Sequence, residues 1–173
     1  MNYGVIDVGS NTVRLCVYDV LCSEKRKFKT IMNRKIMAGL AAYIVDGAFS
    51  DEGIAEAILA VKKCLKRASY LSPDRVDVFA TAVLRNVSNS AQAIAAIEQG
   101  AGCSISLLSN TDEAHLGFVG ASSRGTLDDG ALIDIGGGST EVTVIEDGVD
   151  AARTSLPQGS LSSYKRFVGD VLP

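Results

Sequence analysis

The chain has 173 residues, 47% of them hydrophobic, with 17 glycines and 3 prolines, which is the composition of a globular and not of a disordered protein. The net charge of −3 lacks the basic footprint of general nucleic-acid binding, so we expect no nucleic-acid partner. The apolar stretches are far shorter than a membrane span and the N-terminus does not have the pattern of a signal peptide, so we expect a cytoplasmic protein with no membrane partner.

The first predicted elements follow an order that indicates a fold class. Each element is assigned from periodic apolar positions bounded by caps or turns. In chain order they are strands over residues 3–8, 12–18 and 27–35, a helix from the cap Ser50 to residue 71, a strand over 76–82, a helix over 90–99 that Gly100 stops, a strand over 103–108 and a helix over 111–121 capped by Ser109 or Thr111. Three antiparallel strands and then crossover strands, in the order βββαβαβα, predict an α/β fold of the ribonuclease-H-like, actin-like ATPase class.

After this helix the pattern restarts. Its elements are strands over residues 131–134, 140–145 and 149–155, with an Asp-Gly hairpin signal at 147–148, and a short helix over 160–167. The segment DIGGGSTEVTVIED repeats the earlier DVGSNTVRLCVYD in outline. We therefore expect an actin-like domain over residues 1–116 and the truncated beginning of a second one over 117–173. Three strands leave an apolar face and an open edge, so we also expect a homodimer.

The repeated glycine turns are candidate phosphate sites. Consecutive backbone N–H groups form a concavity for anions, and glycine allows a phosphate to approach the backbone. Two such loops in matched contexts are a stronger signal than either alone. The candidate phosphate-binding residues are Gly9, Ser10 and Asn11 in the first glycine loop (residues 9–11) and Gly136, Gly137, Gly138 and Ser139 in the second glycine loop (residues 136–139).

Acidic residues flank both loops. Asp7 and Asp134 end their strands beside a predicted phosphate site, which requires a cation between the negative charges. Mg²⁺ binds carboxylates while it bridges phosphate oxygens, so we expect Mg²⁺ as the cofactor.

Two further features have both a structural and a functional interpretation. Asp112 and Glu113 fall in the first turn of a predicted helix, where acids complement the helix dipole, but Glu113 is also placed to be a general base that deprotonates water. Arg85 ends the predicted strand, where an arginine is usually just exposed, but its planar donors suit a phosphate oxygen. The cysteines are not in CxxC pairs and His115 is the single histidine, so we expect free, buried thiols and no zinc site.

Five motifs occur in a fixed order along the chain. They are IDVGSNT (residues 6–12), TAVLR (81–85), SNTDEAH (109–115), DIGGGSTE (134–141) and LPQG (156–159). Together they resemble the motifs of the Ppx/GppA family, the exopolyphosphatases and guanosine pentaphosphate phosphatases. The resemblance covers essentially the whole chain.

The resemblance implies two actin-like domains with an active site in the cleft between them. It implies that Glu113 is the catalytic base, that Asp134 and Glu141 bind Mg²⁺ or position water, and that Arg85 braces a phosphate. Asp7 would join the two acids as a metal ligand. The substrate would be inorganic polyphosphate, which loses its end phosphate, or guanosine pentaphosphate, which loses its 5′ phosphate. The sequence does not decide between them.

Three positions depart from the family pattern. Asn110 replaces a glycine, Asp112 replaces a glutamate, and His115 replaces an arginine, which removes a fixed positive charge near Glu113. We expect His115 to be a partly buried helix residue.

Two other hypotheses remain open. One is an ATP-using relative of actin, Hsp70 or sugar kinases, and the other is a non-catalytic sensor of polyphosphate or nucleotide on the same scaffold. The SNTDEAH segment and its Glu113 favour the phosphatase. The truncation weighs against activity of this chain on its own.

Overall fold

The computed structural model describes residues 1–22, 27–123 and 125–168. The chain forms two compact units, Met1–Leu107 (unit 1) and Leu108–Pro173 (unit 2), and each is described by itself. The predicted domain division between residues 116 and 117 falls inside helix α4 (Asn110–Ser122). The whole of α4 belongs to unit 2, because it packs against strands of that unit.

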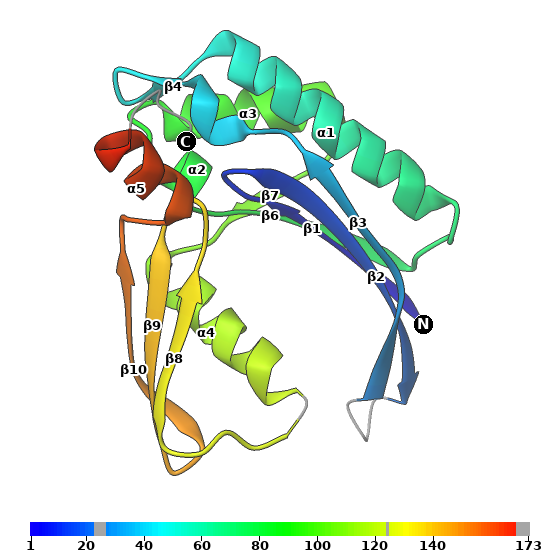
Figure 1. Ribbon diagram of the computed structural model, residues 1–173. Helices are drawn as coiled ribbons and strands as arrows, with labels where there is room; N and C mark the ends of the chain where they lie inside the picture. The colour runs from blue at the N-terminus through cyan, green and yellow to red at the C-terminus, as the bar shows by residue number, and fades with distance from the viewer. Residues whose placement is uncertain (23–26, 124, 169–173) are drawn as a thin grey trace. The chain divides into compact units, whose positions relative to one another are not determined.

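Unit 1 is built on a five-stranded sheet with the strand order β3-β2-β1-β6-β7 (Figure 1). The strands are β1 (Asn2–Val8), β2 (Thr12–Cys22), β3 (Lys27–Met37), β6 (Arg75–Ala80) and β7 (Ile105–Leu107). β1, β2 and β3 are antiparallel to their neighbours, whereas β1, β6 and β7 run parallel. This is the ribonuclease-H-like arrangement predicted from the order of elements.

The helices of unit 1 begin and end for local reasons. They are α1 (Asp51–Ser69), α2 (Ala82–Arg85) and α3 (Ser90–Ala101). Ser50 caps α1 as predicted, since its side chain accepts a hydrogen bond from Gly53 N at 3.2 Å. The predicted stop of α3 at Gly100 is wrong. The helix continues through Gly100 and Ala101, and its C-cap is Gly102, which adopts a left-handed φ of 72°.

Gly100 has a packing role instead. A Cβ atom there would lie 2.4 Å from Cδ1 of Ile58, so its lack of a side chain lets α3 approach α1 closely.

A small hairpin in unit 1 was not predicted. The 3₁₀ helix η2 (Leu40–Tyr43) leads into β4 (Ile44–Val45) and β5 (Ala48–Phe49), which pair antiparallel. Asp46 and Gly47 join them with φ angles of 48° and 77°. Positive φ at both central residues is the requirement of a tight hairpin turn, and Asp-Gly meets it. The sequence signal for this turn, Asp-Gly, is the same as the one at residues 147–148.

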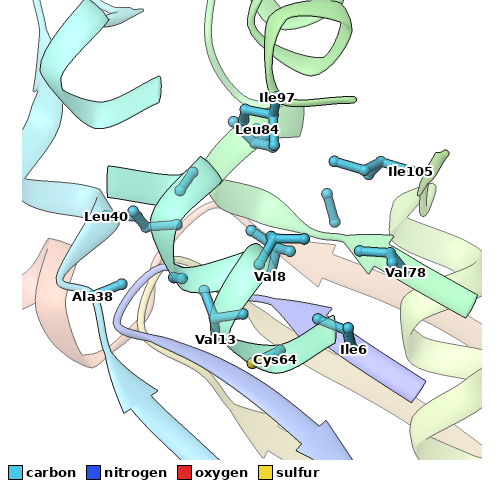
Figure 2. Close-up of a cluster of buried hydrophobic side chains, with 14 of the residues drawn as sticks. Ile6, Val8, Val13, Ala38, Leu40, Cys64, Val78, Leu84, Ile97 and Ile105 are labelled. Carbon is cyan, nitrogen blue, oxygen red and sulfur yellow. The ribbon is translucent and has the colours of Figure 1, made fainter. Parts of the chain in front are cut away.

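The core of unit 1 lies between one face of the sheet and α1 and α3. Alternate residues of β1 and β2 point to this face, and Figure 2 shows Ile6, Val8 and Val13 there beside Cys64 of α1. The buried stripe of α1 consists mostly of small residues, so the helix lies close to the sheet. The stripe is Ala57, Ala60, Val61, Cys64 and Ala68. Burial raises the pKa of the Cys64 thiol to about 11.

The thiols agree with the sequence prediction over the described residues. Cys16 and Cys64 are buried, Cys103 is half-buried, and all three are free. The side chain of Cys22 lies outside the described residues.

Unit 2 is a three-stranded antiparallel sheet, ordered β10-β9-β8, with one helix across a face. Its strands are β8 (Gly130–Ile135), β9 (Thr140–Glu146) and β10 (Val149–Leu156), and α5 (Ser160–Phe167) follows them. α4 packs on β9 and β10 and buries Ala114 and Phe118. No helix within residues 1–22, 27–123 and 125–168 is long and apolar enough to cross a membrane.

Gly53 and Gly120 are both helical, but they have different surroundings. A Cβ at Gly53 would lie 2.6 Å from Cβ of Tyr43 and 2.9 Å from Cζ of Phe49, whereas one at Gly120 meets no atom within 4 Å. We expect Gly53→Ala to lower the free energy of unfolding by about 1–3 kcal/mol through overpacking. We expect Gly120→Ala to raise it by about 0.5–1 kcal/mol, because alanine favours a helix. Urea unfolding followed by circular dichroism measures both, and a stabilised Gly53→Ala protein would contradict the packing described.

Candidate functional site

The two glycine loops close the first hairpin of each unit with the same hydrogen bond. Between β1 and β2, Gly9 N donates to Thr12 O at 3.0 Å, and between β8 and β9, Gly136 N donates to Ser139 O at 2.9 Å. Both glycines stand close to the accepting carbonyl, since a Cβ would lie 3.2 Å and 3.3 Å from it. The internal repeat predicted from the sequence is therefore a repeat of hydrogen bonding as well as of letters.

The carbonyl groups of the first glycine loop are held by the chain that comes after β3. Ser10 O accepts a hydrogen bond from Ala41 N at 2.8 Å. Asn11 O accepts from Ala38 N at 3.1 Å and from Gly39 N at 2.9 Å. The start of η2 thus uses backbone N–H groups to anchor the loop.

The second glycine loop is anchored in the same way by the start of α5. Gly136 O accepts from Ser160 N at 2.9 Å, and Gly137 O accepts from Leu161 N at 3.0 Å and Ser162 N at 3.2 Å. The first N–H groups of a helix have no partner within the helix, and here the loop carbonyls satisfy them. In each unit, therefore, the helix after the third strand fixes the loop after the first strand.

The anchored carbonyls determine where the N–H groups of the loops point. A trans peptide unit is planar, so the N–H of one residue points opposite to the carbonyl of the residue before it. In unit 1 the anchored carbonyl of Ser10 turns the N–H of Asn11 away from η2. In unit 2 the anchored carbonyls turn the N–H groups of Gly137 and Gly138 away from α5. Outward N–H groups of this kind form an anion-binding nest.

Gly159 locks the second glycine loop onto α5. A Cβ at Gly159 would lie 2.5 Å from the carbonyl carbon of Gly137 and 2.6 Å from Gly136 O, so only glycine fits against this backbone. The hydroxyl of Thr140 also donates to Gln158 O at 2.6 Å. The sequence marked LPQG only as a family motif, and the structure shows that its glycine supports the second glycine loop.

Two predicted acids of unit 2 face each other across neighbouring strands. Asp134 of β8 pairs with Glu141 of β9 in the sheet register, so both side chains project from the same face. Glu141 is only 5% exposed and accepts a hydrogen bond from the hydroxyl of Ser155 at 2.8 Å, whereas Asp134 is exposed.

The first turn of α4 contains two acids, Asp112 and Glu113. The Ser109 hydroxyl accepts from Asp112 N at 3.1 Å and donates to the Asp112 carboxylate at 2.6 Å. Ser109 is therefore the N-cap, and Asp112 belongs to the capping arrangement. Glu113, the next residue of this turn, is half-buried.

Glu113 and Asp134 lie on the same side of α4. A Cβ on Gly117 would be 4.0 Å from Oδ2 of Asp134, so this carboxylate lies against the helix at Gly117. Glu113 is one helical turn earlier on the same face. Unit 2 thus carries the predicted base, two predicted metal ligands and the second glycine loop within one helix-and-sheet layer.

Arg85 lies at the end of a helix, not at the end of a strand as the sequence analysis expected. β6 stops at Ala80, and Thr81 O accepts from the N–H groups of Leu84 and Arg85, which closes the turn of α2. Val8 of β1 pairs in parallel with Ala80, so the first glycine loop and α2 leave the same end of the sheet. Arg85 is half-buried, with Nε and Nη2 shielded from solvent.

The predicted Mg²⁺ ligands belong to both units. Within the parts of the chain that the structure describes, three or more His, Cys, Asp or Glu side chains do not gather as a metal site. Asp134 and Glu141 nonetheless fit a magnesium ion, because they place two carboxylates on one face and one of them is buried. The third predicted ligand, Asp7, is an exposed residue of β1 in unit 1. Binding of Mg²⁺ stays a prediction, as does the convergence of the two loops on one phosphate.

His115 is half-buried on α4, as expected, and it has a partner that the sequence did not indicate. Its Nδ1 lies 2.7 Å from Oδ2 of Asp150, and Nη1 of Arg153 donates to the same oxygen at 2.8 Å. The hydrogen bond with His115, assisted by the charge of Arg153, holds the pKa of Asp150 below its ordinary value.

An apolar pocket of about 260 Å³ also occurs in unit 1. Its lining contains none of the predicted site residues and consists of Tyr3, Val5, Tyr18, Val20 and Phe28. An apolar lining does not suit a phosphate, so we do not place the candidate site here.

The chain belongs to the Ppx/GppA phosphatase family, which matches it over residues 20–173. Together with the strand order of unit 1, this assigns the protein to the actin-like ATPase fold class.

Solved structures agree with this assignment. An exopolyphosphatase from Cytophaga hutchinsonii is 26% identical, with a TM-score of 0.86 over 96% of this chain and 54% of that one. The Ppx/GppA phosphatase of Aquifex aeolicus is 22% identical, with a TM-score of 0.77 over 96% and 55%. The ethanolamine utilization protein EutJ of Carboxydothermus hydrogenoformans is 22% identical, with a TM-score of 0.58 over 92% and 52%, and shares the fold. The chain thus spans about half the length of the structures that it matches.

Substitution of Gly159 tests the support of the second glycine loop. We expect Gly159→Ala to lower the free energy of unfolding by about 1–3 kcal/mol, because the new Cβ meets backbone atoms that cannot rotate away. The neighbouring, exposed Gln158→Ala is the control and should change it by less than about 0.5 kcal/mol, since the carbonyl that Thr140 binds remains. Chemical unfolding compares the two, and equal stability would refute the role assigned to Gly159.

Proposed function

We propose that the protein hydrolyses phosphoanhydride bonds and releases a terminal phosphate from inorganic polyphosphate or guanosine pentaphosphate. The observation that carries the proposal is the pair of glycine loops in a member of the Ppx/GppA phosphatase family, each closed by the same hydrogen bond and each anchored through its carbonyls by the start of a helix. The similarity to an exopolyphosphatase supports polyphosphate as a substrate.

In this proposal the two glycine loops grip the terminal phosphate from the two units. The N–H groups of Asn11, Gly137 and Gly138 would bind its oxygens, with Gly9 as the pivot of the first loop. The nearly buried hydroxyls of Ser10 and Ser139 would add donors. Arg85 ends α2, which begins at the same end of the sheet as the first glycine loop. Its guanidinium would stabilise the charge that develops in the transition state.

Glu113 would act as the general base. Asp112 accepts a hydrogen bond from the cap residue Ser109, and Glu113 occupies the position of the base in the family motif that this segment resembles. Glu113 would take a proton from a water molecule while the oxygen of that water attacks the terminal phosphorus. The bond from phosphorus to the bridging oxygen breaks, and the shortened chain leaves with that oxygen while phosphate is released.

Asp7, Asp134 and Glu141 would hold Mg²⁺. When bound, the ion would offset the negative charge of the phosphates beside these carboxylates.

Replacing the proposed base should separate the candidate functions. We expect Glu113→Gln to lower phosphate release by at least about a hundredfold, because a general base is lost. The control Asp112→Asn should lower it by less than about threefold, since it changes a cap and not the base. Release is measured from polyphosphate, guanosine pentaphosphate and ATP with Mg²⁺, in this chain and in a version as long as its solved relatives.

The outcomes distinguish the hypotheses. Equal rates for the wild type and Glu113→Gln would remove the assignment of the base. ATP as the preferred substrate would favour the kinase-like relative, and tight polyphosphate binding without turnover would favour a sensor.

We also propose that the protein is a homodimer in which a second copy covers the open face of the unit 2 sheet. The face opposite α4 carries exposed apolar side chains at alternating positions, namely Ile133, Ile135, Val144 and Leu156. An apolar patch of this kind usually marks an interface.

The dimer can be tested with one charged residue. Ile133→Lys should convert a dimer of this chain into a monomer, because a lysine cannot be buried without a partner. The control Val45→Lys, at an exposed position of β4 in unit 1, should leave the mass unchanged. Light scattering after size exclusion measures the mass, and a wild-type monomer at micromolar concentration would contradict the proposal.

A further inference from the structure

Asp150 of β10 is the centre of a polar cluster that the proposed chemistry does not use. One oxygen, Oδ2, lies 2.7 Å from Nδ1 of His115 and 2.8 Å from Nη1 of Arg153. Its side chain is 16% exposed, compared with 45% for His115 and 33% for Arg153. The acid is thus the most buried member of the cluster and is held from both sides by polar hydrogen donors.

A bulge in β10 makes this cluster possible. Asp150 pairs with Ile145 and Ala152 pairs with Val144, so Ala151 is an extra residue in the strand. In a regular strand, residues three apart project from opposite faces. The extra residue brings Arg153 onto the face of Asp150, and bulges re-aim side chains in this manner.

This face is the one that α4 covers. Asp150 lies opposite Ile145, and Arg153 lies opposite Thr143. Both partners are buried, and the hydroxyl of Thr143 donates to Ala114 O of α4 at 3.5 Å. The bulge therefore directs an acid and its counter-charge toward the helix.

Neighbouring residues of α4 contact all three strands. Ala114 meets β9 through Thr143, Gly117 meets β8 at Asp134, and His115 meets β10 at Asp150. The first is a long hydrogen bond and the second is a van der Waals approach. The contact between His115 and Asp150 is the short, charge-assisted one, which is the strongest type of the three.

The apolar contribution of α4 is small. Ala114 and Phe118 are the buried residues assigned to the helix, while Leu116 and Val119 are each 47% exposed. A helix with so narrow a buried stripe depends on polar contacts for its position more than a well-buried helix does. Glu113 is two residues before His115, so any movement of the helix displaces the proposed base.

We propose that Asp150 and His115 are positioning residues that fix α4 on the sheet and thereby hold Glu113 in its catalytic place. The catalytic part of this inference rests on the proposed function. The bulge at Ala151 and the charge of Arg153 keep the Asp150 carboxylate directed at His115. Neither positioning residue needs to touch the substrate.

The test removes the contact in two ways and retains it in a third variant. His115→Leu and Asp150→Ala each abolish it, whereas His115→Asn places an amide N–H at the position of Nδ1 and so retains a donor to Asp150. Glu146→Gln, at an exposed end of β9, is the control for loss of a carboxylate nearby. The readouts are kcat and KM for phosphate release, and hydrogen–deuterium exchange of the α4 amides, with those of α1 as an internal reference.

We expect His115→Leu and Asp150→Ala to lower kcat roughly tenfold with KM within about twofold, because a small displacement of a catalytic group slows chemistry more than binding. Exchange over residues 110–117 should rise while α1 is unchanged. His115→Asn should keep both kcat and protection within about threefold of the wild type, which a loss of folding would not allow. Glu146→Gln should behave as the wild type does.

Each outcome decides the proposal. Unchanged exchange in His115→Leu and Asp150→Ala overturns the tether, and raised exchange with unchanged kcat overturns its role in catalysis. If the wild type releases no phosphate from any of the substrates, the proposed function fails, and the exchange data alone still decide whether the tether exists.

Discussion

The planarity of the peptide bond is the constraint on which the candidate phosphate site depends. In each unit the start of a helix takes the carbonyls of a glycine loop as hydrogen-bond acceptors. The carbonyl of one residue and the N–H of the next point in opposite directions, so the N–H groups of the loop point away from the helix. The second loop needs Gly159 for the same reason, since any side chain there would push α5 away from the carbonyls. The loops are therefore set before any anion arrives.

The repeat in the sequence is a repeat of topology. Each unit starts with a hairpin of two strands, and a third strand then returns along the second. The helix after this third strand, η2 in unit 1 and α5 in unit 2, therefore begins beside the glycine loop of the hairpin. The conformation of each glycine loop thus requires the third strand and the helix after it, although no residue of that strand belongs to the loop. This explains why LPQG, which is outside the glycine motif, stands with the other family motifs.

The acids depend on a helix lying across a sheet. Asp134 and Glu141 are positioned by strand register, whereas the backbone of Glu113 is positioned by α4. The apolar stripe of α4 is narrow, so the polar contact between His115 and Asp150 has more influence here than it would in a well-buried helix. In this proposal the position of the base is coupled to a bulge in β10, the strand whose Ser155 also donates a hydrogen bond to Glu141.

The sequence alone determined the order of the main elements, the glycine loops and the cap at Ser50, and it narrowed the cap of α4 to Ser109 or Thr111, because these depend on local periodicity, turn chemistry and hydrogen bonds within a few residues. Local reasoning failed at Gly100, where the close approach of Ile58 requires a glycine inside the helix. It also failed at Arg85, because the hydrogen bonds to Thr81 O place this residue in a helix and not in a strand. Only the tertiary structure revealed Gly159 as a support and Asp150 as the partner of His115. Alternation counted along β10 puts Asp150 and Arg153 on opposite faces, and the bulge that unites them exists only in the pairing with β9.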